Sequence, residues 1–420
     1  MPVRPLADYN LKTNTERMKE IVGPLVYRRA RMLCGLSYYP KMLENAFVAG
    51  YENIPTIDDP APLLCFAHKK IQDVMGIVQY MVGRPIERFH PPTLVAQGGL
   101  FHGIFPYQDI IPQFLKVGVL RAPLGWSSRF MAMFFRGLFA DVNAYPVYRD
   151  GADVPTSEED YRHPRFAGRW VTGMKYDQYL NYTRKQTAKS VLQVQKDMVE
   201  KNRSFVILPE GKYCHNGRIA ELLDLAALAA HRKNRSIVYT SFSYEELCPD
   251  ARGRIELFLY TNPPVEPPQS RAEFKDFMNQ GRDLLQSTTI VTASGILAAA
   301  TIAALQNGTT IDRIALHDRF LELAHAVVKS DFLHDPRLAD QDFLEDRWSR
   351  FLSRKASRWF AFRGQEMKVR PRRILDYDAG ERTVPDLLWN MNNIIHAAAL
   401  LGIDTDWLDP EHFKQIVNRA

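Results

Sequence analysis

The sequence has few cysteines and no long apolar run, and each shortage excludes a class of protein. Its four cysteines lie far apart and form neither a CxxC pair nor a zinc-ligand spacing, so we expect free thiols in a reducing compartment. The most apolar stretch, Ile290 to Leu305, is shorter than the roughly 20 residues that a membrane-spanning helix needs and predicts a buried helix. The N-terminus shows no apolar core of the signal-peptide type. We therefore expect a cytoplasmic protein.

The charge balance is mildly basic, with a formal net charge of +6 and a pI of about 9.0. Such an excess suits an anionic partner: a phosphate-bearing substrate, an acidic carrier or an anionic membrane face. We find no nucleic-acid-binding motif and no basic stripe interleaved with aromatic residues, and expect no nucleic-acid partner.

Alternating strand and helix signals predict an α/β fold with a mixed, largely parallel central sheet flanked by helices. Short apolar runs bounded by turn residues indicate the strands, and helical spacing of apolar residues indicates the helices. The expected strands lie at 63–67, 93–96, 143–149, 204–208, 236–244 and 254–261, and the expected helices of this part lie just after residue 70, at 182–202 and at 219–232.

Outside this alternating part the signals are helical or polar. Residues 14–50 and the stretch after Phe274 show only helical spacing, and residues 150–180 have the polar character of a long loop. We therefore expect three parts: an N-terminal helical segment at 1–47, an α/β domain at 48–273 and a helical C-terminal extension at 274–420.

A histidine follows the first predicted strand, where α/β folds place reactive groups. His68 has an acid five residues on, Asp73. Across a strand-to-helix turn, the carboxylate can fold back to one ring nitrogen and leave the other nitrogen to accept a proton. The alternative is a surface histidine beside two lysines with an unrelated helix aspartate.

Two further segments carry charge at predicted strand ends. Pro209-Glu210-Gly211 turns after an apolar strand, and Lys212, His215 and Arg218 follow it, which suits an anionic group such as a phosphate. Arg149 ends a short strand, where a guanidinium can hold a phosphate with two hydrogen bonds. The alternatives are an ordinary solvated turn and a solvated arginine.

The order of these segments resembles the four-block pattern of the HxxxxD-type glycerolipid acyltransferases, the glycerol-3-phosphate and 1-acylglycerol-3-phosphate acyltransferase family. The blocks here are His68 with Asp73, Tyr148 with Arg149, Pro209-Glu210-Gly211, and Ile237 to Tyr244, preceded by the phrase GYENIP. The C-terminal part, with Asn392, Asn393 and His396 after an Ala-rich run, is similar to that of membrane-bound glycerol-3-phosphate acyltransferases.

The resemblance implies transfer of a fatty acyl group from a thioester, acyl-CoA or acylated carrier protein, to the hydroxyl of glycerol 3-phosphate in phospholipid synthesis. His68 is then the general base oriented by Asp73, and backbone N–H groups of the first or third block hold the oxyanion. Arg149, Glu210, Gly211, Lys212 and Arg218 are then the substrate-binding residues. We expect neither a cofactor nor a metal.

The chain departs from the family pattern on the acceptor side, with Tyr213 where an arginine is usual and Lys69-Lys70 after the histidine. Acylation of a lysophospholipid or another alcohol is therefore an alternative, as is a non-catalytic lipid-binding relative. A hydrolase lacks support, because no GxSxG nucleophile turn occurs.

Residues 114–140 combine aromatic residues and methionine with arginine. This composition suits peripheral docking on the cytoplasmic face of an anionic membrane. A buried core helix is the alternative, because aromatic and methionine stripes usually belong to the core.

Overall fold

A computed structural model gives the arrangement of most of the chain. It describes the following residues: 3–6, 45–70, 73–102, 127, 143–148, 153–163, 166, 172–211, 215–377 and 382–418. Arg149, Lys212 and nearly all of the segments 14–44 and 114–140 lie outside them, so the predictions for these residues stay predictions.

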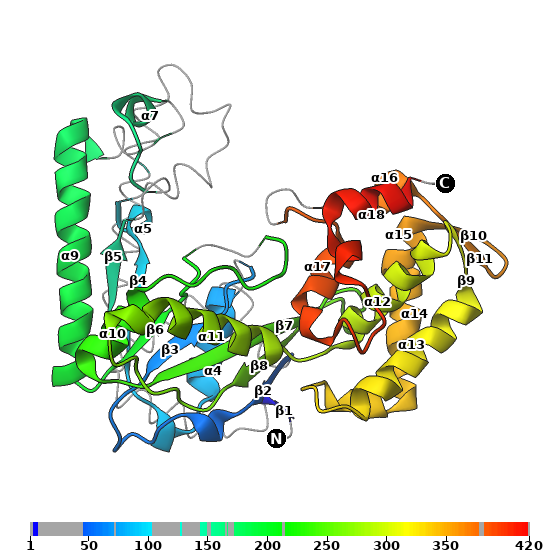
Figure 1. Ribbon diagram of the computed structural model, residues 1–420, viewed down its shortest axis with the longest axis horizontal. Coiled ribbons are helices and arrows are strands. Elements are labelled where there is room, and N and C mark those ends of the chain that lie inside the picture. The colour runs from blue at the N-terminus through cyan, green and yellow to red at the C-terminus, as the bar shows by residue number, and fades with distance from the viewer. Residues whose placement is uncertain are drawn as a thin grey trace.

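The described residues confirm a mixed α/β fold built on an eight-stranded sheet, flanked by helices and followed by a helical C-terminal region (Figure 1). The strands are β1 Arg4–Pro5, β2 Ala46–Ala49, β3 Leu63–Phe66, β4 Pro92–Gln97, β5 Ala144–Val147, β6 Ser204–Ile207, β7 Ile237–Glu245 and β8 Glu256–Thr261. The helices of this part are α4 Asp73–Gly83, α5 Gly98–His102, α7 Glu158–Arg162, α9 Tyr176–Glu200, α10 Leu225–Lys233 and α11 Phe274–Ser287.

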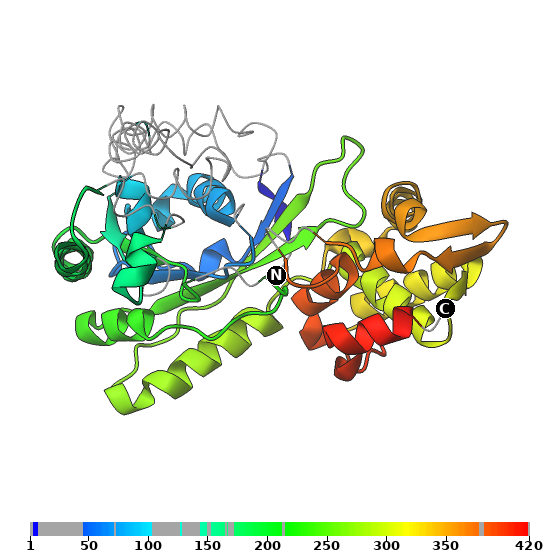
Figure 2. The same ribbon diagram turned by 90° about the horizontal axis from the view of Figure 1, so that it is seen from above.

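The strand order is β1-β2-β8-β7-β3-β6-β4-β5. The five strands from β7 to β5 are parallel to one another, whereas β8 is antiparallel to β7, and β2 is parallel to β8. Helices α10 and α11 lie on one side of the sheet and α4 on the other, as the view from above shows (Figure 2). Because both faces are covered, β3 and β7 are buried along their whole length, which explains the continuous apolar sequence of β3.

Three sequence-based predictions need correction. The end of the predicted helical stretch 14–50 is strand β2, whose side chains are buried in a row. The predicted helix 219–232 begins only at Leu225, because the backbone N–H groups of Ile219 and Ala220 bond to side chains of Gln286 and Glu210 instead of to a helical turn. The predicted loop 150–180 contains helix α7 and the start of α9.

The C-terminal region is helical, as predicted, but it also contains a small antiparallel sheet that helical spacing did not indicate. Its helices are α12 Ala293–Gln306, α13 Arg313–Val328, α14 Gln341–Phe351, α15 Ser357–Trp359, α16 Pro371–Ile374, α17 Asp386–Asn393 and α18 Pro410–Val417, and its strands are β9 Thr310–Asp312, β10 Phe360–Arg363 and β11 Glu366–Val369. The Ala-rich run is the buried helix α12, as expected. None of the helices formed by described residues combines the length and apolar character needed to cross a bilayer.

Polar side chains of β7 attach the C-terminal region to the sheet. The Ser241 and Ser243 hydroxyls donate to the carbonyl oxygens of Thr288 and Ile290, at 2.7 and 2.6 Å. The backbone N–H of Leu247 donates to the Ser294 hydroxyl at 2.8 Å. These bonds satisfy buried polar groups and place α12 and α17 beside the carboxyl end of β7.

Candidate active site

Neighbouring parallel strands bring the first and third sequence blocks together. Strand β3 ends at Phe66 and leads to His68, and its neighbour β6 ends at Ile207 and leads to Glu210. Because carboxyl ends of parallel strands meet at one edge of a sheet, His68 and Glu210 become neighbours although 142 positions separate them.

The Asp73 carboxylate organises the turn between β3 and α4. Its Oδ2 lies 3.2 Å from His68 Nδ1 and accepts the backbone N–H of Lys70 at 2.8 Å and that of Lys69. Asp73 is fully buried and His68 is 7% exposed. The carboxylate thus folds back across the turn to the ring. With Nδ1–H donated to Asp73, Nε2 is the nitrogen that can accept a proton.

Glu210 fixes the backbone on both sides of the site. One carboxylate oxygen accepts the N–H of His68 at 2.6 Å, and the other accepts the N–H of Ala220 at 2.9 Å. Its side chain is buried, so these charge-assisted bonds are among the stronger ones available to a carboxylate. Glu210 therefore holds the His68 backbone in place, which neither the sequence nor the resemblance indicated.

Gly211 closes the Pro-Glu-Gly turn. Its φ of +67° is in the left-handed region that favours glycine, and its N–H donates to the Leu208 carbonyl at 3.0 Å. A Cβ at this position would lie 2.8 Å from the Leu223 side chain. The geometry of the turn therefore accounts for a glycine at position 211.

The expectation of oxyanion donors in the first block is wrong for three N–H groups. The backbone N–H of His68 donates to Glu210, and those of Lys69 and Lys70 donate to Asp73. A group whose hydrogen is already donated to a buried carboxylate is not available to a developing oxyanion.

Arg218 lies against the C-terminal helix α17. Its Nε donates to the Asn392 side chain at 3.0 Å, and Asn392 in turn donates to the carbonyl oxygen of Asn216 at 2.8 Å. Burial lowers the pKa of Arg218, and the charge of Asp409 opposes this shift. The two terminal amino groups of Arg218 make no hydrogen bond with any described residue. Of the three predicted phosphate ligands Arg149, Lys212 and Arg218, only Arg218 belongs to the described residues.

The two lysines after His68 face the C-terminal region. Lys69 is fully buried, and its ammonium group lies 3.5 Å from the Thr289 hydroxyl. Lys70 forms an ion pair with Glu246, and its ammonium group lies 4.4 Å from the centre of the Trp389 ring. The structure thus places both lysines, which depart from the family pattern, in buried contacts.

The network around Lys70 continues into the C-terminal region. Glu246 also pairs with Arg382, which pairs with Asp386, and Asp386 accepts a bond from Lys355 at 2.5 Å. Sequence reasoning missed all four residues. Glu246 carried a usable signal, since it directly follows β7, the other neighbour of β3. The others reach the network only through long-range packing.

His396 of the Asn-Asn-x-x-His segment is neutral near pH 7. Burial and the charge of Lys69 lower the pKa of His396 to about 4. Neither ring nitrogen has a hydrogen-bond partner among the described residues, and the ring packs edge-on against Phe332 with 5.3 Å between centroids. The segment thus lies beside the first block as well as the third.

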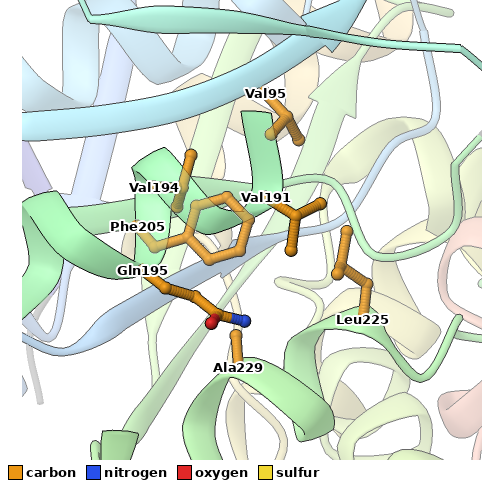
Figure 3. A pocket seen from close by; sticks show the side chains of 7 residues that line it. All are labelled: Val95, Val191, Val194, Gln195, Phe205, Leu225 and Ala229. Atoms are coloured by element: carbon orange, nitrogen blue, oxygen red, sulfur yellow. The ribbon is translucent and has the colours of Figure 1, made fainter. Parts of the chain in front are cut away.

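One apolar hollow lies under α9 and α10 (Figure 3). It is lined by Val95, Val191, Val194, Gln195, Phe205, Leu225 and Ala229. The space does not admit a water-sized sphere, so it is a packing feature and not a substrate site. Within the described ranges, no three His, Cys, Asp or Glu side chains gather as a metal site would require.

Comparison with known proteins leaves the family open. No protein-family model matches the chain, and no curated protein matches it. The crystal structure of the 1-acyl-sn-glycerophosphate acyltransferase PlsC from Thermotoga maritima is similar at 14% identity, covering 64% of this chain and 80% of that one, with a TM-score of 0.33. At this level of similarity, the function has to be argued from the site itself.

Proposed function

We propose that the chain is an O-acyltransferase that moves a fatty acyl group from a thioester to the hydroxyl of glycerol 3-phosphate. The observation that carries this proposal is the buried contact between His68 Nδ1 and Asp73 Oδ2, 3.2 Å apart, at the carboxyl end of β3. It leaves the histidine in the tautomer of a general base, as in hydrolytic triads. The sequence resemblance supplies the substrate class.

The reaction requires one base and no covalent enzyme intermediate. His68 Nε2 takes the proton of the acceptor hydroxyl as its oxygen attacks the thioester carbonyl. The tetrahedral intermediate then expels the thiolate, which takes the proton back from His68. Asp73 stabilises the imidazolium that forms between these steps.

The charges around the site suit a phosphate-bearing acceptor. We assign the acceptor phosphate to Arg218, together with Arg149 and Lys212 from the sequence resemblance. Glu210 and Gly211 act by positioning the His68 backbone and the turn. The acyl donor is acyl-CoA or an acylated carrier protein, and the site requires no cofactor or metal. We place the protein in the cytoplasm, on the inner face of a membrane.

A second acceptor class deserves a separate test. Tyr213 replaces the arginine usual in the third block, which removes one phosphate ligand. This favours a lysophospholipid or another alcohol as the alternative acceptor, with the same base and the same donor.

Release of free thiol from acyl-CoA tests the proposal. Glycerol 3-phosphate, a lysophosphatidate and no acceptor are compared in parallel. We expect acceptor-dependent release that falls about 10²- to 10⁴-fold in His68→Ala, the usual contribution of a general base. His325→Ala, an exposed histidine on α13, is the matched control and should keep wild-type activity.

Three outcomes would contradict parts of the proposal. Release without any acceptor indicates a hydrolase, and release only with the lysophosphatidate replaces the acceptor. Full activity in a folded His68→Ala protein removes the base from the mechanism. Circular dichroism of each variant separates a loss of chemistry from a loss of fold.

A further inference from the structure

The net positive charge of the chain arises from one short segment. Residues 351–374 contain eight Arg and Lys and a single acidic residue, Glu366, a net charge of +7. The whole chain carries +6, so all other residues together carry −1. The mild overall basicity is therefore a property of this segment, which the sequence analysis did not separate from the rest.

This segment folds as one surface at the end of the molecule opposite α9 (Figures 1 and 2). Strand β10 pairs with β11, and β11 pairs with β9, both antiparallel. The Arg370 N–H donates to the Trp359 carbonyl at 2.7 Å, which fastens the start of α16 to α15. We call six exposed cations of this segment the basic hairpin surface: Arg358, Arg363, Lys368, Arg370, Arg372 and Arg373. The seventh, Arg354, has its guanidinium beside Gly253 and is not counted with them.

These six cations are available to an outside partner. All six are exposed, and none forms an ion pair with a described residue. Lys355 of the same segment shows the contrast, since it is partly buried and paired with Asp386. Strand pairing puts Arg363 and Lys368 on the outer face, because the opposite face carries Phe360 and Met367, both fully buried.

Two apolar side chains are exposed beside the hairpin turn. Phe362 is 39% exposed, lies two residues before Gly364 of the turn and shares the strand face of Met367, opposite to that of Arg363 and Lys368. Ile314 is 47% exposed and follows Arg313, whose N–H donates to the Gln365 carbonyl at 2.8 Å. Apolar groups exposed at the edge of a cationic surface are typical of surfaces that enter the headgroup region of an anionic membrane.

We propose that the basic hairpin surface docks on anionic phospholipid. The segment interleaves cations with aromatic residues, which raises nucleic acid as the other polyanion. However, three of its four aromatic residues, Phe351, Trp359 and Phe360, are buried, which leaves Phe362 alone to stack on a base. The inference rests on charge and exposure and is independent of the proposed reaction, so either can fail without the other.

Co-sedimentation with vesicles tests the surface. The full chain should bind phosphatidylcholine vesicles that contain phosphatidylglycerol and not pure phosphatidylcholine. Arg372→Gln with Arg373→Gln should weaken binding about 30-fold, since each cation near an anionic membrane contributes roughly fivefold. Lys185→Gln with Lys189→Gln on α9, two exposed lysines at the opposite end, is the matched control and should bind like wild type.

Phe362→Ser separates the apolar contribution from the ionic one. At high salt the wild type should retain some membrane binding that this variant loses, because salt screens charge and not apolar burial. Equal loss in the two double variants would overturn the proposal, as would equal binding to both kinds of vesicle. Preference for duplex DNA over anionic vesicles would assign the surface to nucleic acid instead.

Discussion

Charged side chains around His68 are buried and have hydrogen-bond or ion-pair partners within the protein. Those of the basic hairpin surface are exposed and have no ion pairs among the described residues. Asp73 and Glu210 bond to backbone amides, and Lys70 bonds to Glu246. Buried charges must find partners, so they fix the local geometry. Exposed charges keep their hydration and remain available for binding. The same residue types thus stabilise the fold around His68 and, in our proposal, bind a partner at the basic hairpin surface.

The largest expected difference between the two regions concerns Asp73. Asp73→Ala leaves two backbone N–H groups and the His68 ring without their acceptor, which should cost about 3 to 5 kcal/mol of unfolding free energy. Asp177→Ala is the matched control, an exposed acid in the first turn of α9, and should cost less than about 1 kcal/mol. Urea unfolding measures both, and equal losses would contradict the comparison.

The second prediction uses pH to reveal a buried carboxyl near the end of β7. Burial raises the pKa of Glu245 to about 7, and the charge of Arg347 opposes the shift. Between the ordinary pKa and this raised value, the folded state keeps a proton that the unfolded state has lost. Stability therefore falls as pH rises from about 4.5 to 7, by about 3 kcal/mol, and is flat above.

Glu245→Gln should remove this pH dependence. Urea titrations at pH 5 and pH 8 should show the wild type losing about 3 kcal/mol relative to the variant. Other titrating groups cancel in this difference, because both proteins share them. An equal gap at both pH values would show that Glu245 titrates normally.

Lys70→Met tests the buried ion pair of Lys70 with Glu246, which also pairs with Arg382. Glu246 keeps Arg382 after the substitution, so we expect a loss of about 2 kcal/mol and not the larger cost of an abandoned charge. Lys196→Met removes an exposed pair with Glu200 and should cost less than about 0.5 kcal/mol. If the two losses were equal, the Lys70 contacts would not be energetically significant.

The smallest effect is expected at the basic hairpin surface. Arg372→Gln with Arg373→Gln should change the unfolding free energy by less than about 0.5 kcal/mol, because both side chains are exposed and neither forms an ion pair with a described residue. The same variant that loses membrane binding should therefore melt at the wild-type temperature. A large drop in melting temperature would show that these two arginines stabilise the fold.

Much of the sheet could be predicted from the sequence because its strands are apolar runs bounded by turn residues. β3, β4, β5, β6, β7 and β8 lie where such runs occur. The contact of Asp73 with His68 could also be anticipated, since five residues and a turn separate them. Both are local signals, which a single sequence retains.

The remaining features depend on contacts between distant residues. Strands β10 and β11 have only four residues each, and only the turn at Gly364 marks their hairpin. The bonds of Glu210 to the His68 backbone, and of Arg218 to Asn392, join residues 142 and 174 positions apart. No periodicity encodes such pairs, because they arise only when strands and helices pack.

The position of α17 has a consequence for synthesis on the ribosome. Trp389 covers the Lys70 ammonium group, and Asn392 bonds Arg218, yet both follow every strand of the eight-stranded sheet in the chain. The sheet strands that hold His68 emerge earlier, so the nascent protein carries an unfinished site until α17 has been made. A chain that stalls or terminates before α17 should be inactive although its sheet has formed.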